Sequence, residues 1–409
     1  MCRQRVFPFL LCLSLILFSG CKKDDVPEVE APLLRGSLLI QASSLYTLAN
    51  GISKVEISVF EIVEGEGRSE IAANLFIGDS LVANASRYTY QTNEPGFVRF
   101  KAELDGQTSD IGITARAPLS LDTLEIPIVF HLIKDHRGPI NRQSLEEPGQ
   151  LEALLKEANA MMNPGPVTLN SIQDNTNWHT ANVKLVAATH DPEGNLLPIP
   201  GLHVYEAPTD TLHLSFQADW LWDTYWHPDY YMNAWVGYHE NPRYGGQGTY
   251  PFFEPGSPLY QGAAVRAKPD SPDFLTGILL TRVDEEILLH ELGHYIGLPH
   301  VFSEICEGDS DFCPDTHHYV RVGFGDLSGT VRQGCNGIRF LNNNHMDYGP
   351  RSHMFTYDQV NRMRHGLQFG MYRPFERIRQ GGGVANLEPN NRAPRVHKPD
   401  RVVLAPSDY

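Results

Sequence analysis

The chain has 409 residues, which is enough for two or three domains with a large hydrophobic core. Its composition is that of a soluble globular protein, and its formal net charge is −16. Because no block of basic residues interrupts this acidity, the sequence argues against nucleic acid as a partner and fits a secreted or surface protein.

The first 20 residues predict a signal peptide. Arg3 and Arg5 precede an apolar run over residues 6–18 that is too short to span a bilayer comfortably. Ser19 and Gly20 then stand directly before Cys21. This arrangement resembles a bacterial lipoprotein cleavage site, with Cys21 as the lipidated first residue. The alternative is an ordinary signal peptide with an incidental cysteine.

Residues 21–35 predict a tether behind this anchor. Residues 22–25 are two lysines and two aspartates, and they resemble the charged export signal of surface lipoproteins in Bacteroides-type bacteria. We therefore expect an outer-membrane lipoprotein that is held to the membrane through Cys21 and exposed at the cell surface. Retention at the periplasmic face is the alternative.

Residues 36–118 predict an all-β sandwich. Val55, Ile57 and Val59 alternate with polar residues, and residues 98–104 alternate in the same way. The dipeptide at residues 105–106, Asp-Gly, predicts a tight hairpin turn to a returning strand. The pattern resembles bacterial immunoglobulin-like modules. Such a module would act as a spacer, or have a role in binding or latency.

Residues 122–375 predict a second, larger domain, followed by an irregular tail over residues 376–409. The domain opens with a buried strand at residues 124–133, whose His131 we interpret as a core histidine. Apolar residues at helical spacing over 151–162 predict a helix, and alternation over 183–187 predicts a strand. The stretch over residues 240–275, rich in Gly, Pro and Tyr, predicts a long loop that could form a cleft wall.

The candidate site lies in the sequence HELGHYIGLPH, from His290 to His300. His290 and His294 are four residues apart, so a helix places them on one face, where two neutral imidazoles can bind one Zn²⁺. Glu291 is close enough to reach a metal-bound water without being a ligand. Gly297 can end the helix in a left-handed conformation, which lets His300 return as third ligand and leaves a fourth position for water.

This stretch resembles the metzincin zinc endopeptidases, whose signature adds a downstream methionine turn. The turn matches residues 344–348, which read Asn-His-Met-Asp-Tyr. Phe302, the pair Asp315-Thr316 and the run from Phe355 to Met363 narrow the resemblance to the pappalysin and cytophagalysin family. The resemblance covers about residues 122–370.

The resemblance implies an α+β metzincin-type catalytic domain preceded by the immunoglobulin-like sandwich. Its expected parts are a twisted mixed sheet, a backing helix, an active-site helix and a loop-rich C-terminal subdomain. The predicted strand at residues 183–187 would form the upper rim of the cleft and pair with extended substrate.

The implied activity is that of a secreted or surface-anchored zinc endopeptidase acting on protein or peptide substrates. His290, His294 and His300 would bind one catalytic zinc ion, and Glu291 would act as the general base. Met346 would form an apolar floor beneath the histidines, and Tyr348 would help to stabilise the reaction intermediate. The alternative is a catalytically silent or latent surface lipoprotein that acts as a binding protein or adhesin.

Three cysteines lie in the catalytic region: Cys306, Cys313 and Cys335. An odd number permits one disulfide and leaves one thiol. We expect a bridge from Cys335 to either Cys306 or Cys313, which would hold the long loop after His300.

The same loop carries four acidic residues that could help to bind Ca²⁺, namely Glu304, Glu307, Asp309 and Asp311. Their spacing fits no defined calcium loop, so a solvated acidic loop is the favoured interpretation.

Overall fold

The structure, a computed structural model, describes residues 34–134, 145–165, 177–206, 213–241, 243–307, 311–321, 331–349, 352–374 and 393–407. The predicted leader, the lipidation site at Cys21 and most of the tether lie outside these residues. None of the helices in the described part is long and apolar enough to cross a membrane.

Residues 37–116 form the all-β region that the alternating pattern predicts, and we call this region the N-terminal module. Its nine strands are β1 (Ser37–Ala42), β2 (Tyr46–Leu48), β3 (Val55–Val63), β4 (Gly67–Glu70), β5 (Ala73–Ile77), β6 (Ser80–Ala85), β7 (Arg87–Tyr90), β8 (Gly96–Leu104) and β9 (Gln107–Arg116). One sheet has the order β1-β3-β4, with β7 also paired to β3, and the other has the order β2-β9-β8-β5-β6.

The core of the N-terminal module consists of the inward-facing residues of these strands. Ile57 of β3, Phe100 of β8 and Ile113 of β9 are completely buried in one cluster. Strands β8 and β9 form the predicted hairpin, with Leu104 opposite Gln107 and positive φ angles of 50° at Asp105 and 78° at Gly106. A turn with two such residues matches the twist of the flanking strands.

The second region is built on a six-stranded mixed sheet, which we call the main sheet. Its strands are β10 (Leu124–Lys134), β11 (Val183–Ala187), β12 (Leu202–Glu206), β13 (Met232–Val236), β14 (Gly246–Gly248) and β17 (Gly277–Leu280). The order is β11-β10-β13-β17-β14, with β12 also paired to β10. All pairs are parallel except β14 with β17. The central strands are apolar on both faces because both faces are covered.

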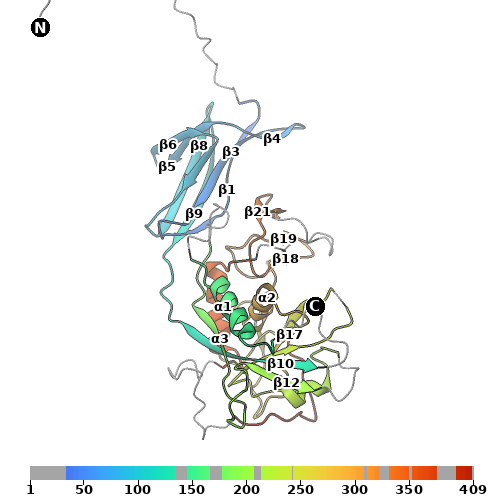
Figure 1. Cartoon of the computed structure of the whole chain (residues 1–409). Coiled ribbons are helices and arrows are strands. Elements are labelled where there is room, and N and C mark those ends of the chain that lie inside the picture. Colours follow the sequence, from blue (N-terminus) through green and yellow to red (C-terminus); the bar gives the residue numbers. More distant parts are fainter. Residues whose placement is uncertain are drawn as a thin grey trace, which may run out of the picture.

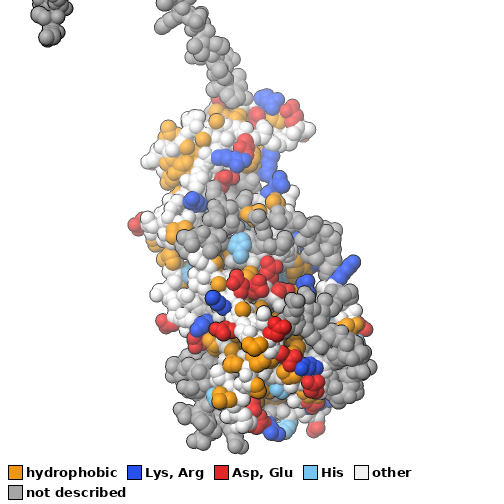
Figure 2. Space-filling model, viewed as in Figure 1, with side chains coloured by type: hydrophobic (Ala, Val, Ile, Leu, Met, Phe, Trp, Pro, Cys, Tyr) orange, Lys and Arg blue, Asp and Glu red, His pale blue; other side chains and the backbone are white. Residues whose placement is uncertain are grey.

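Helices cover one face of the main sheet, and they lie between it and the N-terminal module in Figure 1. The helices are α1 (Gln150–Met162), α2 (Glu285–Tyr295) and α3 (Tyr357–Phe369). Residues from these helices and from β10, β13 and β17 form one large core. The short 3₁₀ helix η2 (Asp219–Thr224) supplies aromatic residues to a smaller core that includes Trp235 and Leu279. On the face shown in Figure 2, acidic side chains gather near the middle of the second region.

The loop-rich part after α2 contains two small two-stranded sheets. Strand β18 (Phe302–Ser303) pairs with β19 (Tyr319–Val320), and β20 (Val331–Gln333) pairs with β21 (Arg339–Leu341). Cys306 and Cys335 form a disulfide, while Cys313 is free and buried. The partner of Cys335, which the sequence left open, is therefore Cys306.

One expectation about the cleft was wrong, and another was incomplete. Strand β11, the predicted upper rim, lies at the edge of the main sheet opposite β14 and packs against α1. The strand that borders α2 is β14, inside the stretch predicted as a long loop. That stretch also contains β15 (Phe252–Phe253) and β16 (Ala264–Val265). Strand β14, with two glycines and one glutamine, carries none of the apolar signal by which strands are predicted.

The described part of the predicted tail, residues 393–407, is irregular but packs against the second region. The amide of Val403 donates to the carbonyl of Asp273 at 2.9 Å, and the amide of Tyr250 donates to the carbonyl of Pro406 at 2.6 Å. Ser407 forms an antiparallel bridge with Thr249, directly after β14. The segment therefore pairs with the outer edge of the chain directly after β14.

Candidate metal centre

Helix α2 begins where the sequence predicts. The Asp284 carboxylate accepts a hydrogen bond from the amide of Ile287 at 2.9 Å, and Glu285 and Glu286 lie in the first turn. These acidic groups stabilise the positive end of the helix dipole. Leu288, with Leu289 and Leu292, is fully buried in the large core. The helix is therefore fixed at its start and along its length.

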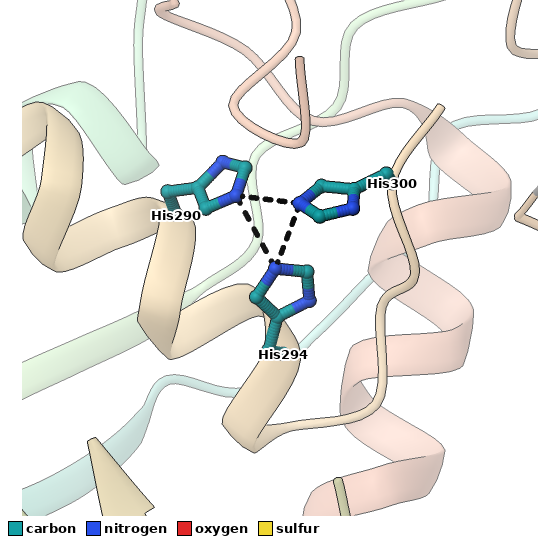
Figure 3. A group of neighbouring side chains, drawn as sticks. All are labelled: His290, His294 and His300. Atoms are coloured by element: carbon teal, nitrogen blue, oxygen red, sulfur yellow. Dashed lines mark hydrogen bonds between the residues drawn. The ribbon is translucent and has the colours of Figure 1, made fainter. Parts of the chain in front are cut away.

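The three histidines of the motif meet at one point. Helix α2 carries His290 and His294, and the turn at Gly297, whose φ is 107°, returns the chain so that His300 faces them (Figure 3). The Nε2 atoms are 3.0 Å apart between His290 and His300, and 3.2 Å apart in the other two pairs. Within the described residues, this is the one group of three or more side chains able to hold a metal.

Hydrogen bonds on the other ring nitrogens determine which tautomers these histidines adopt. Nδ1 of His290 donates to the carbonyl of His345, and Nδ1 of His294 donates to the carbonyl of Leu298, both at 2.7 Å. A neutral ring that uses its hydrogen at Nδ1 presents a lone pair at Nε2. Lone pairs that face one another repel, unless a cation lies between them.

The donor set fits zinc. Tetrahedral ligation with Zn–N bonds of about 2.0–2.1 Å needs nitrogens separated by about 3.3 Å, close to the observed distances. Burial lowers the pKa of His294 to about 4, and burial with the neighbouring histidines holds the pKa of His300 well below its usual range. Both rings are therefore neutral, as a metal ligand must be.

Met346 packs against α2, the helix that carries His290 and His294. Its side chain is fully buried, and a Cβ placed on Gly293 of α2 would overlap its sulfur. The amide of Met346 donates to the Asn344 side chain at 2.8 Å, and its carbonyl accepts from the amide of Val301 at 3.2 Å. The turn is thus bound both to itself and to the segment that follows His300.

Glu291 lies next to the edge strand β14. Its carboxylate is buried, and a Cβ on Gly246 would come within 2.7 Å of its Cγ and 2.8 Å of Oε1. A Cβ on Gly248 would come within 2.7 Å of the His294 Cβ. Glycine at both positions lets β14 pass directly over the helix that carries the histidines and the glutamate.

The ring of Tyr348 lies beside those of His290 and His300. Its ring centroid is 5.1 Å from that of His290 and 5.0 Å from that of His300. Its carbonyl accepts hydrogen bonds from Asn342 at 2.7 Å and from Arg332 at 3.1 Å. These bonds fix the backbone of Tyr348 at the site.

Other histidines in the chain have structural surroundings. His131 is completely buried, with Nε2 2.9 Å from the Asn233 side-chain oxygen and Nδ1 2.9 Å from Nδ1 of His203. This confirms its interpretation as a core histidine. His345 contributes its carbonyl to His290, a role the sequence could not reveal because it belongs to the backbone.

Among the described residues, those proposed for Ca²⁺ form no group that could hold a metal ion. Glu304 and Glu307 are exposed, and Asp309 lies outside the described residues. Asp311 is buried and accepts hydrogen bonds from the amide of Cys313 at 3.1 Å and the hydroxyl of Thr316 at 2.9 Å. Within the described chain, Asp311 therefore organises its own loop.

Sequence reasoning missed Gly246 and Gly248 as parts of the site. The signal that could have revealed them is their spacing, because glycines at i and i+2 lie on the same face of a strand and permit close approach of another backbone.

One protein-family model matches the segment that carries the site. The model of the peptidase family described as Pregnancy-associated plasma protein-A matches residues 217–368. No curated protein matches the chain. Among solved structures, the chain is similar to Tannerella forsythia mature mirolysin in complex with a cleaved peptide, with 20% identity and a TM-score of 0.47 over 67% of this chain and 100% of that chain.

Two further solved structures show a similar likeness. Mirolysin in complex with compound 9 has 20% identity and a TM-score of 0.45 over 67% of this chain and 100% of that chain. A mutant of Tannerella forsythia promirolysin has 18% identity and a TM-score of 0.45 over 64% of this chain and 87% of that chain. The family match spans β14, the three histidines and the methionine turn, so the segment that carries the site is similar to that peptidase family.

Proposed function

We propose that the chain is a zinc-dependent endopeptidase that hydrolyses internal peptide bonds of proteins or peptides. The observation that carries this proposal is the convergence of the Nε2 atoms of His290, His294 and His300 within 3.0–3.2 Å of one another. Glu291, the next residue after the first histidine, is buried beside them. Three imidazoles and one adjacent carboxylate are the groups that metal-assisted peptide hydrolysis requires.

The residues of the chain then have distinct roles. A bound zinc ion would supply Lewis-acid polarisation of a water molecule and of the peptide carbonyl. The Glu291 carboxylate takes the proton from the attacking water and delivers it to the leaving amine as the peptide C–N bond breaks. The Tyr348 hydroxyl donates a hydrogen bond to the oxyanion that develops on the former carbonyl. Met346 keeps the floor of the site apolar.

The edge strand β14 supports an extended peptide as substrate. The amide of Thr249 donates to the carbonyl of Gly277, and the carbonyl of Gly245 accepts from the amide of Thr281. The odd-numbered residues of this strand therefore direct their backbone groups toward β17. In an antiparallel pair the alternate residues point their backbone groups the other way. Gly246 and Gly248 therefore direct their backbone groups away from β17, where a peptide can add as a further strand. The added strand would end before Thr249 and Tyr250, because the segment at Pro406 and Ser407 already pairs with them.

We further propose the location and organisation that the sequence suggests. Residues 1–20 are a lipoprotein signal peptide, Cys21 carries the lipid, residues 21–35 are the tether, and the protein is exposed at the outer-membrane surface. The two facing sheets of the N-terminal module support an immunoglobulin-like sandwich over residues 36–118. The main sheet, α1, α2 and the loop-rich part after α2 support a metzincin-type domain over residues 122–375.

The proposal is tested by digestion of unfolded casein and a mixed peptide library with residues 22–409. The matched variant is Glu291→Ala, with zinc content measured for both proteins. We expect internal cleavage by the wild type alone and about one zinc per chain in each protein. Folded protein without zinc would refute the metal site, and zinc without cleavage would favour the binding-protein alternative.

A further inference from the structure

One contact between the N-terminal module and the second region is made by an arginine that is largely enclosed. Arg116 ends β9, and its guanidinium is 2.8 Å from the carboxylate of Asp358 and 3.5 Å from that of Asp315. It lies over the rings of Tyr46, 4.2 Å from the centroid, and of Tyr357, 5.0 Å from the centroid. The Arg116 side chain is 19% exposed and that of Asp315 is fully buried, so water screens this ion pair weakly.

A second contact lies beside the first. The buried side-chain amide of Asn177 donates to the hydroxyl of Ser44 at 2.9 Å and to the carbonyl of Asp315 at 2.8 Å. The carbonyl of Asn177 accepts from the amide of Tyr357 at 3.1 Å. Ser44 belongs to the N-terminal module, so both contacts converge on Asp315 and the start of α3.

Asp315 holds the first turn of α3. Its carboxylate accepts hydrogen bonds from the hydroxyl of Thr356 at 2.6 Å and from the amide of Asp358 at 3.0 Å. Burial and the nearby Asp358 raise the pKa of Asp315, while Arg116 opposes this shift. The Arg116 guanidinium, which contacts both carboxylates, stabilises their negative charge at the start of α3.

The same turn of α3 is bonded to the methionine turn. Gln359 and Asn344 exchange two side-chain hydrogen bonds of 2.7 and 3.0 Å. The Asn344 side chain also accepts from the amide of Met346 at 2.8 Å. A continuous series of ion pairs and hydrogen bonds therefore connects Arg116, through Asp315 and the start of α3, to Met346.

We propose that the N-terminal module is a fixed part of the catalytic unit, and that Arg116 is a positioning residue that holds the floor of the histidine site through Asp315 and the start of α3. The N-terminal module would then support the histidine site, and it would not be a spacer. The expected effect of Arg116 on turnover rests on the proposed function. Its expected effect on metal retention can be measured without turnover.

The consequence of losing Arg116 follows from the charges. Two carboxylates would then face each other at the interface without a cation, which loosens the first turn of α3. Gln359 and Asn344 would move with that turn, and the support of Met346 would weaken. We expect both a lower turnover and a faster loss of zinc, at temperatures far below the unfolding midpoint.

The test compares Arg116→Gln with Arg99→Gln in the full chain from residue 22. Arg99 is an exposed arginine of the same module, and among the described contacts its ion-pair partner is Asp110. Three quantities are measured: kcat and KM on an uncharged peptide that the wild type cleaves, the half-time of zinc transfer to a chelator, and amide hydrogen exchange over residues 344–348 and 356–359.

Arg116→Gln should lower kcat about tenfold with little change in KM, and should speed zinc loss and exchange by about the same factor. Arg116→Lys, which keeps the charge, should recover most of each effect, and Arg99→Gln should match the wild type. If Arg116→Gln loses zinc and exchanges amide hydrogens at the same rates as Arg99→Gln, the inference is overturned. A wild type that holds zinc but cleaves nothing would refute only the proposed function, because zinc loss and exchange still decide the role of Arg116.

Discussion

Met346 and Gly293 are in contact so close that no side chain fits between them: the sulfur of Met346 occupies the space where a Cβ on Gly293 would stand. Gly293 is the residue directly before the ligand His294 on α2. The contact therefore links the methionine turn to the helix at the level of the metal, and it requires glycine for packing rather than for an unusual backbone conformation.

Gly293→Ala should push Met346 and α2 apart and destabilise the protein by about 1–3 kcal/mol, as overpacking of a core does. The histidines should then hold zinc less tightly. Thermal unfolding with and without zinc measures both effects. The double variant Gly293→Ala with Met346→Ala restores the space, and should be closer to the wild type in zinc affinity than Gly293→Ala alone. Unchanged zinc affinity in Gly293→Ala would contradict the expectation.

Gly246→Ala should impair turnover while the metal stays bound. The added Cβ would lie 2.8 Å from Oε1 of Glu291 and 2.7 Å from the carbonyl oxygen of Leu279, so the glutamate or the edge strand must shift. A displacement of about 1 Å at a catalytic group costs on the order of 100-fold in rate. The measurement is kcat together with zinc content.

Gly245→Ala provides the matched control, because its Cβ would meet only the flexible end of Ile287, at 3.3 Å. We expect it to retain nearly full activity. Equal kcat values for the two alanine variants would show that close approach of β14 to Glu291 is unimportant.

Tyr348→Phe should lower kcat by about 100-fold, the scale for loss of one hydrogen-bond donor to an oxyanion. Bound zinc should stay unchanged, because the ring contacts with His290 and His300 do not need the hydroxyl. Steady-state kinetics and metal analysis of the purified variant check this. Full turnover in the variant would remove Tyr348 from the mechanism.

The stability of the protein should fall with rising pH through Asp311. Burial raises the pKa of this carboxyl to about 7 in the folded protein, against about 3.9 in an unfolded chain. The folded state therefore binds the proton more tightly, and the contribution of Asp311 is most favourable below about pH 4 and is lost as the pH rises to about 7. The loss amounts to no more than about 4 kcal/mol.

Asp311→Asn should remove this dependence while keeping an oxygen for the amide of Cys313 and the hydroxyl of Thr316. In urea unfolding, the variant should gain stability over the wild type at about pH 8 and gain less or none at about pH 5. Asp79→Asn, at an exposed position, should differ little from the wild type at both values. A constant difference between Asp311→Asn and the wild type across this range would contradict the assignment.

The residues that could be predicted from the sequence are those that act through their neighbours in the chain. Asp284 caps α2, Gly297 has a positive φ, and Thr356 forms the predicted capping box with Gln359. In each case the physical cause lies within four residues. The histidine motif is of the same kind, because helix geometry and one glycine turn bring its three rings together.

The features that escaped prediction depend on contacts between distant parts of the chain. Strand β14 has three residues and two glycines, so it lacks the alternation that marks a strand, and its place beside α2 is set by pairing with β17. Arg116 meets Asp315 across 199 residues of sequence. Cysteine spacing permitted two partners for Cys335, and only the folded loop selects Cys306.

The pairing of Pro406 and Ser407 with Tyr250 and Thr249 has a practical consequence for handling the protein. The ring of Tyr250 contacts that of His294, with 5.5 Å between their centroids. A purification tag or fusion partner joined close behind Ser407 would therefore lie near the three histidines. Such an addition could obstruct incoming peptides, and assays of hydrolysis are best performed with an affinity handle placed ahead of the N-terminal module.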